Sequence, residues 1–189
     1  ALLAATCATA VGTLTALALY RYRFRGKRLA EGLVFVLIMA PEIVMGISLL
    51  ILFVALGVGL GFTTVLLAHV TFCLPFVTVT VLARLNGFDP HLVEAAQDLG
   101  ASELQTVARV ILPMAAPALA AGWLLSFTLS VDDVIITTFV AGPDYELLPL
   151  KLYCMGRRAE TPEINALSTV LFALTLVVAG LAQRLLQRH

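Results

Sequence analysis

The class of this protein can be read from residues 32–83, GLVFVLIMAPEIVMGISLLILFVALGVGLGFTTVLLAHVTFCLPFVTVTVLA, which contain one formally charged residue, Glu42. A helix needs about 20 residues to cross the hydrocarbon core of a bilayer, so this run is too long for one crossing. A glycine-rich turn at residues 57–61 divides it into two expected spans, 32–56 and 62–83. Water cannot be the main solvent for such a segment.

Composition extends this conclusion to the whole chain of 189 residues. Residues of the AVILMFWYC set make up 60%, and charged residues 13%, against about 25% in ordinary soluble domains. This excludes a single soluble globular domain and a disordered chain. Twelve basic and twelve acidic residues give a net charge of zero, which argues against a nucleic-acid binder. The three cysteines form no readable disulfide framework or zinc site.

Three further uncharged windows, 1–20, 113–131 and 164–183, are long enough to be spans. We therefore expect an all-α polytopic membrane helix bundle with five spans, forming one transmembrane domain over residues 1–189. The chain opens inside a span with Ala1 rather than with Met. Five spans and an inside C-terminus place the N-terminus outside, so we expect that an earlier span is missing from this sequence.

The distribution of basic residues predicts the orientation of these spans. Five cations crowd the first loop, namely Arg21, Arg23, Arg25, Lys27 and Arg28. The positive-inside rule makes that loop cytoplasmic. Alternation then places the 57–61 turn outside, residues 84–112 inside and residues 141–163 outside. The last of these is the weakest assignment, because this outer loop also contains basic residues.

The loop at 84–112 carries helix punctuation rather than the composition of a simple connector. Asp89 followed by proline fits a helix N-cap, and Gly100 suits the left-handed position that ends a helix. Ser102 and Gln105 have the spacing of a capping box for a second helix. The pattern predicts a helix-turn-helix on the cytoplasmic surface.

The same loop resembles the EAA loop of binding-protein-dependent ABC importer permeases, which have a MetI-like fold. The matching residues are Glu94, Ala95, Ala96, Gly100, Leu112 and Pro113, while Val110 stands where the family pattern usually has Ile. The resemblance implies that residues 84–113 form a coupling helix docked on a cytoplasmic ATPase, with these six residues at or beside the contact. The alternative is an ordinary surface helix pair.

Residues 20–27, 72–76, 121–133 and 142–151 bring the resemblance closer to the PotC-type permeases of spermidine/putrescine importers. It implies a multi-pass protein of the bacterial inner membrane that imports polyamines by alternating access. It also implies a heterodimer with a homologous permease subunit, two ABC ATPase subunits and a periplasmic polyamine-binding protein. No GxxxxGK[ST] loop is present. We therefore expect no enzymatic activity and no cofactor here, with ATP and Mg²⁺ on the partner ATPase.

Three acids lie in apolar surroundings and are candidates for the substrate path. Glu42 falls near the middle of the expected span 32–56, where a charge is costly and should face protein or a water-filled cavity. It is either a station for an ammonium group or an acid that braces the helix beside Pro41. Asp132 and Asp133 fall at the outer boundary of the fourth span. They either attract a polycation or are solvated interface acids.

Aromatic residues and His69 offer weaker signals. Trp123, Tyr145 and Tyr153 could pack on alkyl-ammonium groups, and Trp123 is included in the candidate path. Packing and interfacial anchoring explain these aromatic residues better. We expect His69 to be hydrogen-bonded structure rather than a metal ligand, because no cysteine or acid lies at ligand spacing.

Other functions stay open at this point. The chain could belong to an ABC importer of another small solute, since related importers share the loop. From other classes, it could be an ion-coupled secondary transporter with Glu42 as proton site, or a membrane scaffold. Dependence of uptake on an ion gradient would identify the ion-coupled transporter. Absence of uptake would identify the scaffold.

Overall fold

The computed structural model describes residues 1–89, 91–143, 145, 147–148, 150–151, 153–154, 165–166, 168–170, 172–173 and 175–177. Its elements, in chain order, are α1 Leu2–Arg21, α2 Lys27–Met39, α3 Glu42–Ala55, α4 Phe62–Asn86, α5 His91–Asp98, α6 Glu103–Thr106, the π-helical turn η1 Val107–Ile111, α7 Leu112–Asp132 and α8 Ile135–Val140. This part of the chain contains no strand, which confirms the all-α fold class.

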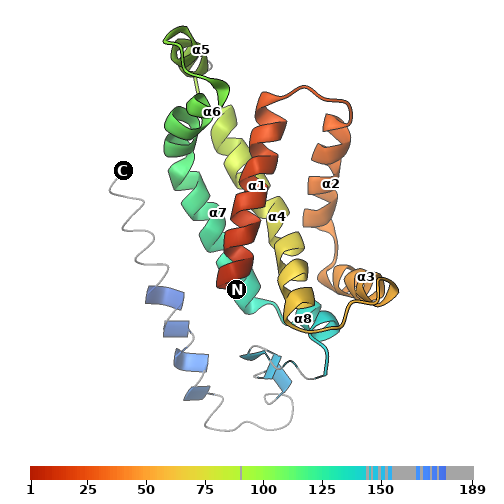
Figure 1. Cartoon of the computed structure of the whole chain (residues 1–189). Helices are drawn as coiled ribbons and strands as arrows, with labels where there is room; N and C mark the ends of the chain where they lie inside the picture. Colours follow the sequence, from red (N-terminus) through yellow and green to blue (C-terminus); the bar gives the residue numbers. More distant parts are fainter. Residues whose placement is uncertain are drawn as a thin grey trace.

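Helices α1, α4 and α7 pack against one another along their lengths and form the core of the bundle (Figure 1). A stripe of small residues on α1 permits this close packing. Its members are all buried: Ala4, Ala8, Gly12 and Ala16. A Cβ at Gly12 would lie 2.8 Å from the Val77 side chain of α4, so only glycine fits at this crossing.

The three core helices confirm three of the expected spans. Leu2–Arg21, Phe62–Asn86 and the continuous run Glu103–Asp132 are each long and apolar enough to cross a membrane. They cover the expected spans 1–20, 62–83 and 113–131. Half of the residues of the expected fifth span, 164–183, lie outside the described residues.

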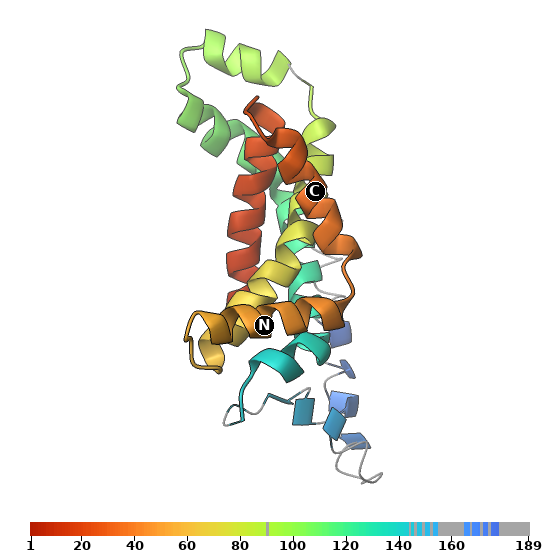
Figure 2. The same cartoon turned by 90° about the vertical axis from the view of Figure 1, so that its right-hand side faces the viewer.

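The expected span over residues 32–56 is not one straight helix. Helix α2 ends at Met39, α3 begins at Glu42, and the two axes are bent by 113°. Proline 41 explains the break, because it has no N–H and forces the preceding residue out of the helical region. Ala40 is accordingly extended, with φ −67° and ψ 131°. Helix α3 then crosses one end of the bundle, where it packs against α8 (Figures 1 and 2).

A second proline shapes the long helix that follows the helix-turn-helix. Pro113 cannot donate to the carbonyl of Arg109, and its ring would clash with that carbonyl in a regular α-helix. The chain widens into η1 immediately before it, where the N–H of Leu112 bonds to the carbonyl of Val107. The π-turn therefore lets α6 and α7 continue as one run of 30 residues despite the proline.

Candidate functional site

The first candidate region is the basic end of the bundle, which we define as the α1–α2 loop together with residues 87–111. Both loops lie at the same end of the core helices (Figure 1). This is the arrangement that the predicted orientation requires. The opposite end, where α7 meets α8 at Asp132 and Asp133, is called the acidic end below.

Helix α5 at the basic end has the caps that its sequence predicts. The N–H of His91 donates to Oδ1 of Asp89 at 3.0 Å. At the other end Gly100 has φ +81°, its N–H bonds to the Gln97 carbonyl at 2.8 Å, and the N–H of Ala101 bonds to the Ala96 carbonyl at 3.0 Å. These two bonds form a Schellman motif, so the predicted left-handed turn at Gly100 is confirmed.

The capping box of the second helix is also confirmed. The Gln105 N–H donates to the Ser102 hydroxyl at 3.3 Å, and the Ser102 N–H donates to the Gln105 side chain at 2.9 Å. With both ends of the turn capped, the angle between α5 and α6 is held by local hydrogen bonds.

None of the residues of helix α5 is buried, although the half-buried Val93 packs against the core cluster at the basic end. Glu94 and Ala95 are exposed, and Ala96 is half-buried. Two leucines beside it are unusually open to solvent, Leu99 at 89% and Leu104 at 77%. Such apolar exposure on a short capped helix suits a surface that a partner covers.

The last two residues of the motif lie apart from that surface. Leu112 packs against the core cluster at the basic end, which includes Leu85 and Ile111. Pro113 is exposed at the start of α7. The motif residues are therefore divided between the outward-facing helix α5 and the turn that leads into the bundle.

A cluster of three side chains joins the two loops of the basic end. One carboxylate oxygen of Glu103, at the start of α6, accepts a hydrogen bond from Nε of Arg21 at 2.9 Å and another from the Tyr22 hydroxyl at 2.8 Å. The hydrogen bond from Arg21 lowers the pKa of the exposed Glu103 carboxyl. The hydrogen bond to Glu103 raises the pKa of Tyr22.

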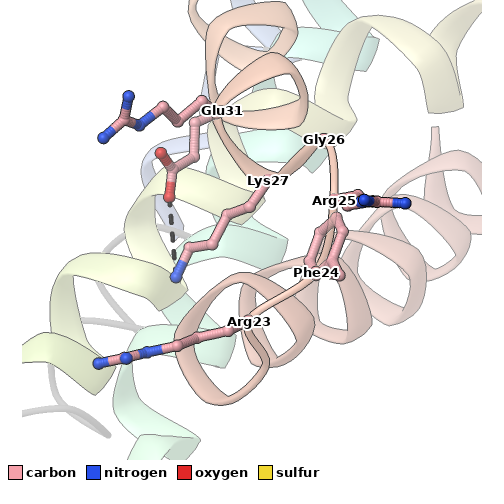
Figure 3. A pocket seen from close by; sticks show the side chains of 7 residues that line it. Arg23, Phe24, Arg25, Gly26, Lys27 and Glu31 are labelled. Carbon is pink, nitrogen blue, oxygen red and sulfur yellow. Dashed lines mark ion pairs between the residues drawn. The ribbon is translucent and has the colours of Figure 1, made fainter.

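A basic hollow of about 590 Å³ lies next to this cluster, between α1 and α2 (Figure 3). Its cations do not converge, since Arg23 and Arg25 point in opposite directions and Lys27 pairs with Glu31 at 4.0 Å. The geometry fits a solvated basic loop rather than a built anion site.

The acidic end contains a buried polar network. Nδ1 of His69 lies 2.6 Å from the Ser130 hydroxyl, and Nε2 lies 3.2 Å from Oδ2 of Asp133 and 3.0 Å from the Thr137 hydroxyl. Asp133 also accepts from the N–H of Ile136 at 3.1 Å, and from the N–H and hydroxyl of Thr137 at 2.9 and 2.7 Å. The carboxylate thus caps α8 at the break after α7. The structural role expected for His69 is confirmed.

Asp132 and Asp133 are neighbours in sequence but differ in their surroundings. Asp133 is 7% exposed and its oxygens are occupied by internal donors. Asp132 is exposed, and no described residue pairs with it. It ends α7, where the helix dipole already concentrates negative charge. A cation approaching this end would therefore meet Asp132 first.

Both acids line a cavity of about 900 Å³ at the acidic end. Its wall also includes His69, Phe62 and Tyr145, and the last two rings meet edge to face at 6.2 Å. The volume lies within the usual range for small-molecule sites, about 300 to 1,000 Å³. Among the described residues, no cluster of His, Cys, Asp and Glu could hold a metal ion.

The other two path candidates lie away from this cavity. Glu42 is exposed on the first turn of α3 rather than inside a straight span, and no described residue pairs with it. Trp123 lies in the seam between α7 and α1, where Nε1 donates to the Thr6 hydroxyl at 3.1 Å. Its ring stacks on Phe127 at 5.5 Å. The structure therefore brings together Asp132 and Asp133 but not Glu42 and Trp123.

Comparison with known families accounts for this combination of bundle and capped loop. Residues 8–189 match the model of the binding-protein-dependent transport system inner membrane component. The chain belongs to this family. It is therefore a permease component of an ABC transport system and a multi-pass protein of the inner membrane.

Curated relatives align with all or nearly all of this permease. The spermidine/putrescine transport system permease protein PotC of Escherichia coli K12 is 57% identical over 188 residues, covering 100% of this chain and 71% of the relative. PotC of Haemophilus influenzae is 54% identical over 189 residues, covering 100% and 74%. The putrescine transport system permease protein PotI of Escherichia coli K12 is 41% identical over 192 residues, covering 98% and 68%.

Solved structures agree on the fold of the permease. An inward-facing conformation of the MetNI methionine ABC transporter matches with a TM-score of 0.81 at 20% identity, covering 98% of this chain and 88% of that chain. An amino acid ABC transporter matches with a TM-score of 0.67 at 20% identity, covering 100% and 90%. These confirm the MetI-like bundle.

Two sets of long-range hydrogen bonds in the permease could not be predicted from the sequence. The bonds from His69 to Ser130 and Asp133, and those from Arg21 and Tyr22 to Glu103, join residues more than 60 positions apart. For the His69 bonds, the signal in the sequence is a lone histidine inside an apolar span. For the Glu103 bonds, it is an acid in a loop expected on the same side of the membrane as the basic loop.

Proposed function

We propose that this chain is the permease subunit of an ATP-driven polyamine importer that passes spermidine or putrescine from a periplasmic binding protein to the cytosol by alternating access. A homologous second permease subunit would complete the translocation path. Two ABC ATPase subunits would bind the ATP and Mg²⁺. The observation that carries the proposal is the 57% identity, over the full length of the chain, to a spermidine/putrescine permease.

The geometry of the basic end supports the coupling part of this proposal. Helix α5 is capped at both ends, carries Glu94, Ala95 and Ala96, and leaves Leu99 almost fully exposed. A rigid, outward-facing helix of this kind can receive a rigid-body displacement from an ATPase. Gly100 would fix its angle, while Leu112 and Pro113 would carry the displacement into α7.

The acidic end supports the choice of a cationic substrate. Asp132, with which no described residue pairs, places an exposed carboxylate at the negative end of the α7 dipole, on the wall of the cavity of about 900 Å³. Asp133 would act indirectly, by holding the break between α7 and α8 that shapes this wall. Glu42 and Trp123 would belong to other parts of the path. Glu42 would meet substrate near the α2–α3 bend, and Trp123 would set the spacing of α1 and α7.

Uptake of labelled spermidine by proteoliposomes containing the permease, its partner permease, the ATPases and the binding protein tests this function. Uptake should require ATP inside the vesicles and should survive collapse of the ion gradients. Uptake that stops when the gradients collapse would indicate an ion-coupled transporter, and absence of uptake of any solute would indicate a scaffold. Uptake of an uncharged solute in preference to polyamines would indicate a related importer.

Preference between the two polyamines defines the second candidate. The 41% identity to a putrescine permease supports an importer restricted to putrescine. Competition between labelled spermidine and unlabelled putrescine in the same vesicles decides between them. The identity of 57% to a permease whose name includes both polyamines favours an importer of both.

A further inference from the structure

The contact between Arg21, Tyr22 and Glu103 has a position that the motif itself does not explain. Glu103 is the first residue of α6, directly after the turn that ends α5. Arg21 is the last residue of α1, and Tyr22 follows it. The cluster therefore connects the second arm of the helix-turn-helix to a different core helix from the one that this arm continues into.

The hydrogen bonds of the cluster hold the Glu103 carboxylate in a fixed orientation. The Arg21 side chain is only 14% exposed, and it donates Nε to Glu103 at 2.9 Å while the Tyr22 hydroxyl donates to the same oxygen at 2.8 Å. A charge-assisted bond and a second donor on one oxygen fix the carboxylate from two directions. The Glu103 side chain is 55% exposed, so the contact contributes little to folding stability.

Its surroundings show why such a link matters. Helix α5 contains no buried residue, so it is attached to the bundle through its two ends and through the half-buried Val93, which packs against the core cluster at the basic end. Its far end continues through α6 and η1 into α7. Without the cluster, a push on α5 would reach α7 along the backbone but would reach α1 only through side-chain packing.

We infer that Glu103, held by Arg21 and Tyr22, is a positioning residue for energy coupling, which makes α1 and α7 move together when the ATPase displaces α5. The inference rests on the proposed function. It assigns the cluster no contact with substrate or nucleotide. Its effect is on how much transport each hydrolysed ATP delivers.

The test measures spermidine uptake and ATP hydrolysis together in the complete complex in proteoliposomes. Glu103→Gln keeps the shape of the side chain but removes the charge, and it should lower uptake roughly three- to tenfold. ATP hydrolysis should stay within about twofold of the wild type, so the ATP used per spermidine rises. Tyr22→Phe should show the same change to a smaller degree.

A charge exchange provides the rescue. Arg21→Glu and Glu103→Arg should each uncouple, and the double variant should recover much of the lost uptake because the ion pair is restored with reversed polarity. Glu31→Gln is the matched control, because Glu31 pairs with Lys27 at 4.0 Å within α2, away from the Arg21, Tyr22 and Glu103 cluster. It should transport like the wild type.

The outcomes separate this inference from the proposed function. Absence of ATP-dependent uptake by the wild-type complex would overturn the proposed function itself. If the wild type transports and Glu103→Gln keeps the same ATP used per spermidine, only the inference is overturned. Equal loss of uptake and hydrolysis without rescue by the charge exchange would show a role in assembly instead, and would also overturn it.

Discussion

Asp133 at the acidic end of the permease and Glu94 at the basic end differ in what surrounds their carboxylates. At the acidic end, Asp133 is 7% exposed and its oxygens are filled by His69, Thr137 and the backbone of α8. At the basic end, α5 has no buried residue, and Glu94 pairs with the exposed His91 at 3.2 Å. An end closed by internal hydrogen bonds can serve as a fixed point. An end that presents an open, capped helix is fitted to a partner.

The largest effect on transport is expected from a substitution of Gly100 at the basic end. Proline there cannot adopt φ +81° and loses the bond to the Gln97 carbonyl, so the angle between α5 and α6 changes. We expect Gly100→Pro to lower ATP-driven spermidine uptake at least about a hundredfold, without loss of membrane insertion. Radiolabel uptake and the amount of permease in washed membranes measure the two effects.

Gly100→Asn is the matched control, because asparagine tolerates the left-handed conformation better than other side chains. It should keep most of the uptake. Undiminished uptake by Gly100→Pro would contradict a coupling role for this turn.

Asp133→Ala disrupts the buried polar network at the acidic end. It leaves the N–H groups of Ile136 and Thr137 without their side-chain acceptor, and it removes one of the two partners of His69 Nε2, the other being the Thr137 hydroxyl. We expect the free energy of unfolding to fall by about 3 kcal/mol, since removing one member of a buried polar pair leaves the others unsatisfied. Thermal unfolding of the detergent-purified complex measures this change.

Asp132→Ala serves as the comparison within the same end. Its carboxylate is exposed and without a described partner, so its removal should leave Tm nearly unchanged. Equal losses of Tm in the two variants would show that the division between the neighbouring acids is wrong.

Asp132→Asn tests whether the exposed acid at the acidic end contributes to substrate binding. The exposed charge of Asp132 at the cavity wall should attract an ammonium group, and its removal should raise the KM for spermidine about fivefold with little change in kcat. Initial uptake rates over a range of spermidine concentrations measure both constants. Glu31→Gln removes a charge far from this cavity and should leave KM unaltered. A KM equal to that of the wild type would remove Asp132 from the substrate path.

Glu42→Gln should have the smallest effect. Glu42 is exposed at the α2–α3 bend and lies outside the cavity that contains Asp132. We expect a decrease in spermidine uptake of about twofold, because a screened single charge contributes little to attraction. The same uptake assay measures it, and identical kinetics for the variant would leave Glu42 without a part in transport.

Much of the fold could be predicted because its signals are local. Hydropathy located α1, α4 and α7, and the capping residues Ser102 and Gln105 marked the start of α6. Gly100 marked the end of α5, since only glycine adopts φ +81° without strain. Each of these signals lies within a few residues of the feature that it predicts.

The remaining features depend on contacts that sequence does not reveal. Hydropathy counts apolar residues but does not register the direction of a helix, so it does not predict the bend of 113° between α2 and α3, even with Pro41 at that position. The division between Asp132 and Asp133 depends on His69, which lies more than 60 residues earlier. A pair of adjacent acids in a sequence does not indicate which one is buried.

The π-turn at Val107–Ile111 has a consequence for how the long helix should be drawn. One extra residue in a turn rotates every following side chain by about 100° relative to an uninterrupted α-helix. A helical wheel drawn through Glu103–Asp132 would therefore assign Glu103 and Gly122 to incorrect relative azimuths. Deleting one residue from the turn would remove the extra residue, so Gly122 would keep its direction toward Val77, against which it now packs. The ring of Pro113 would then meet the carbonyl four residues before it in a regular α-helix.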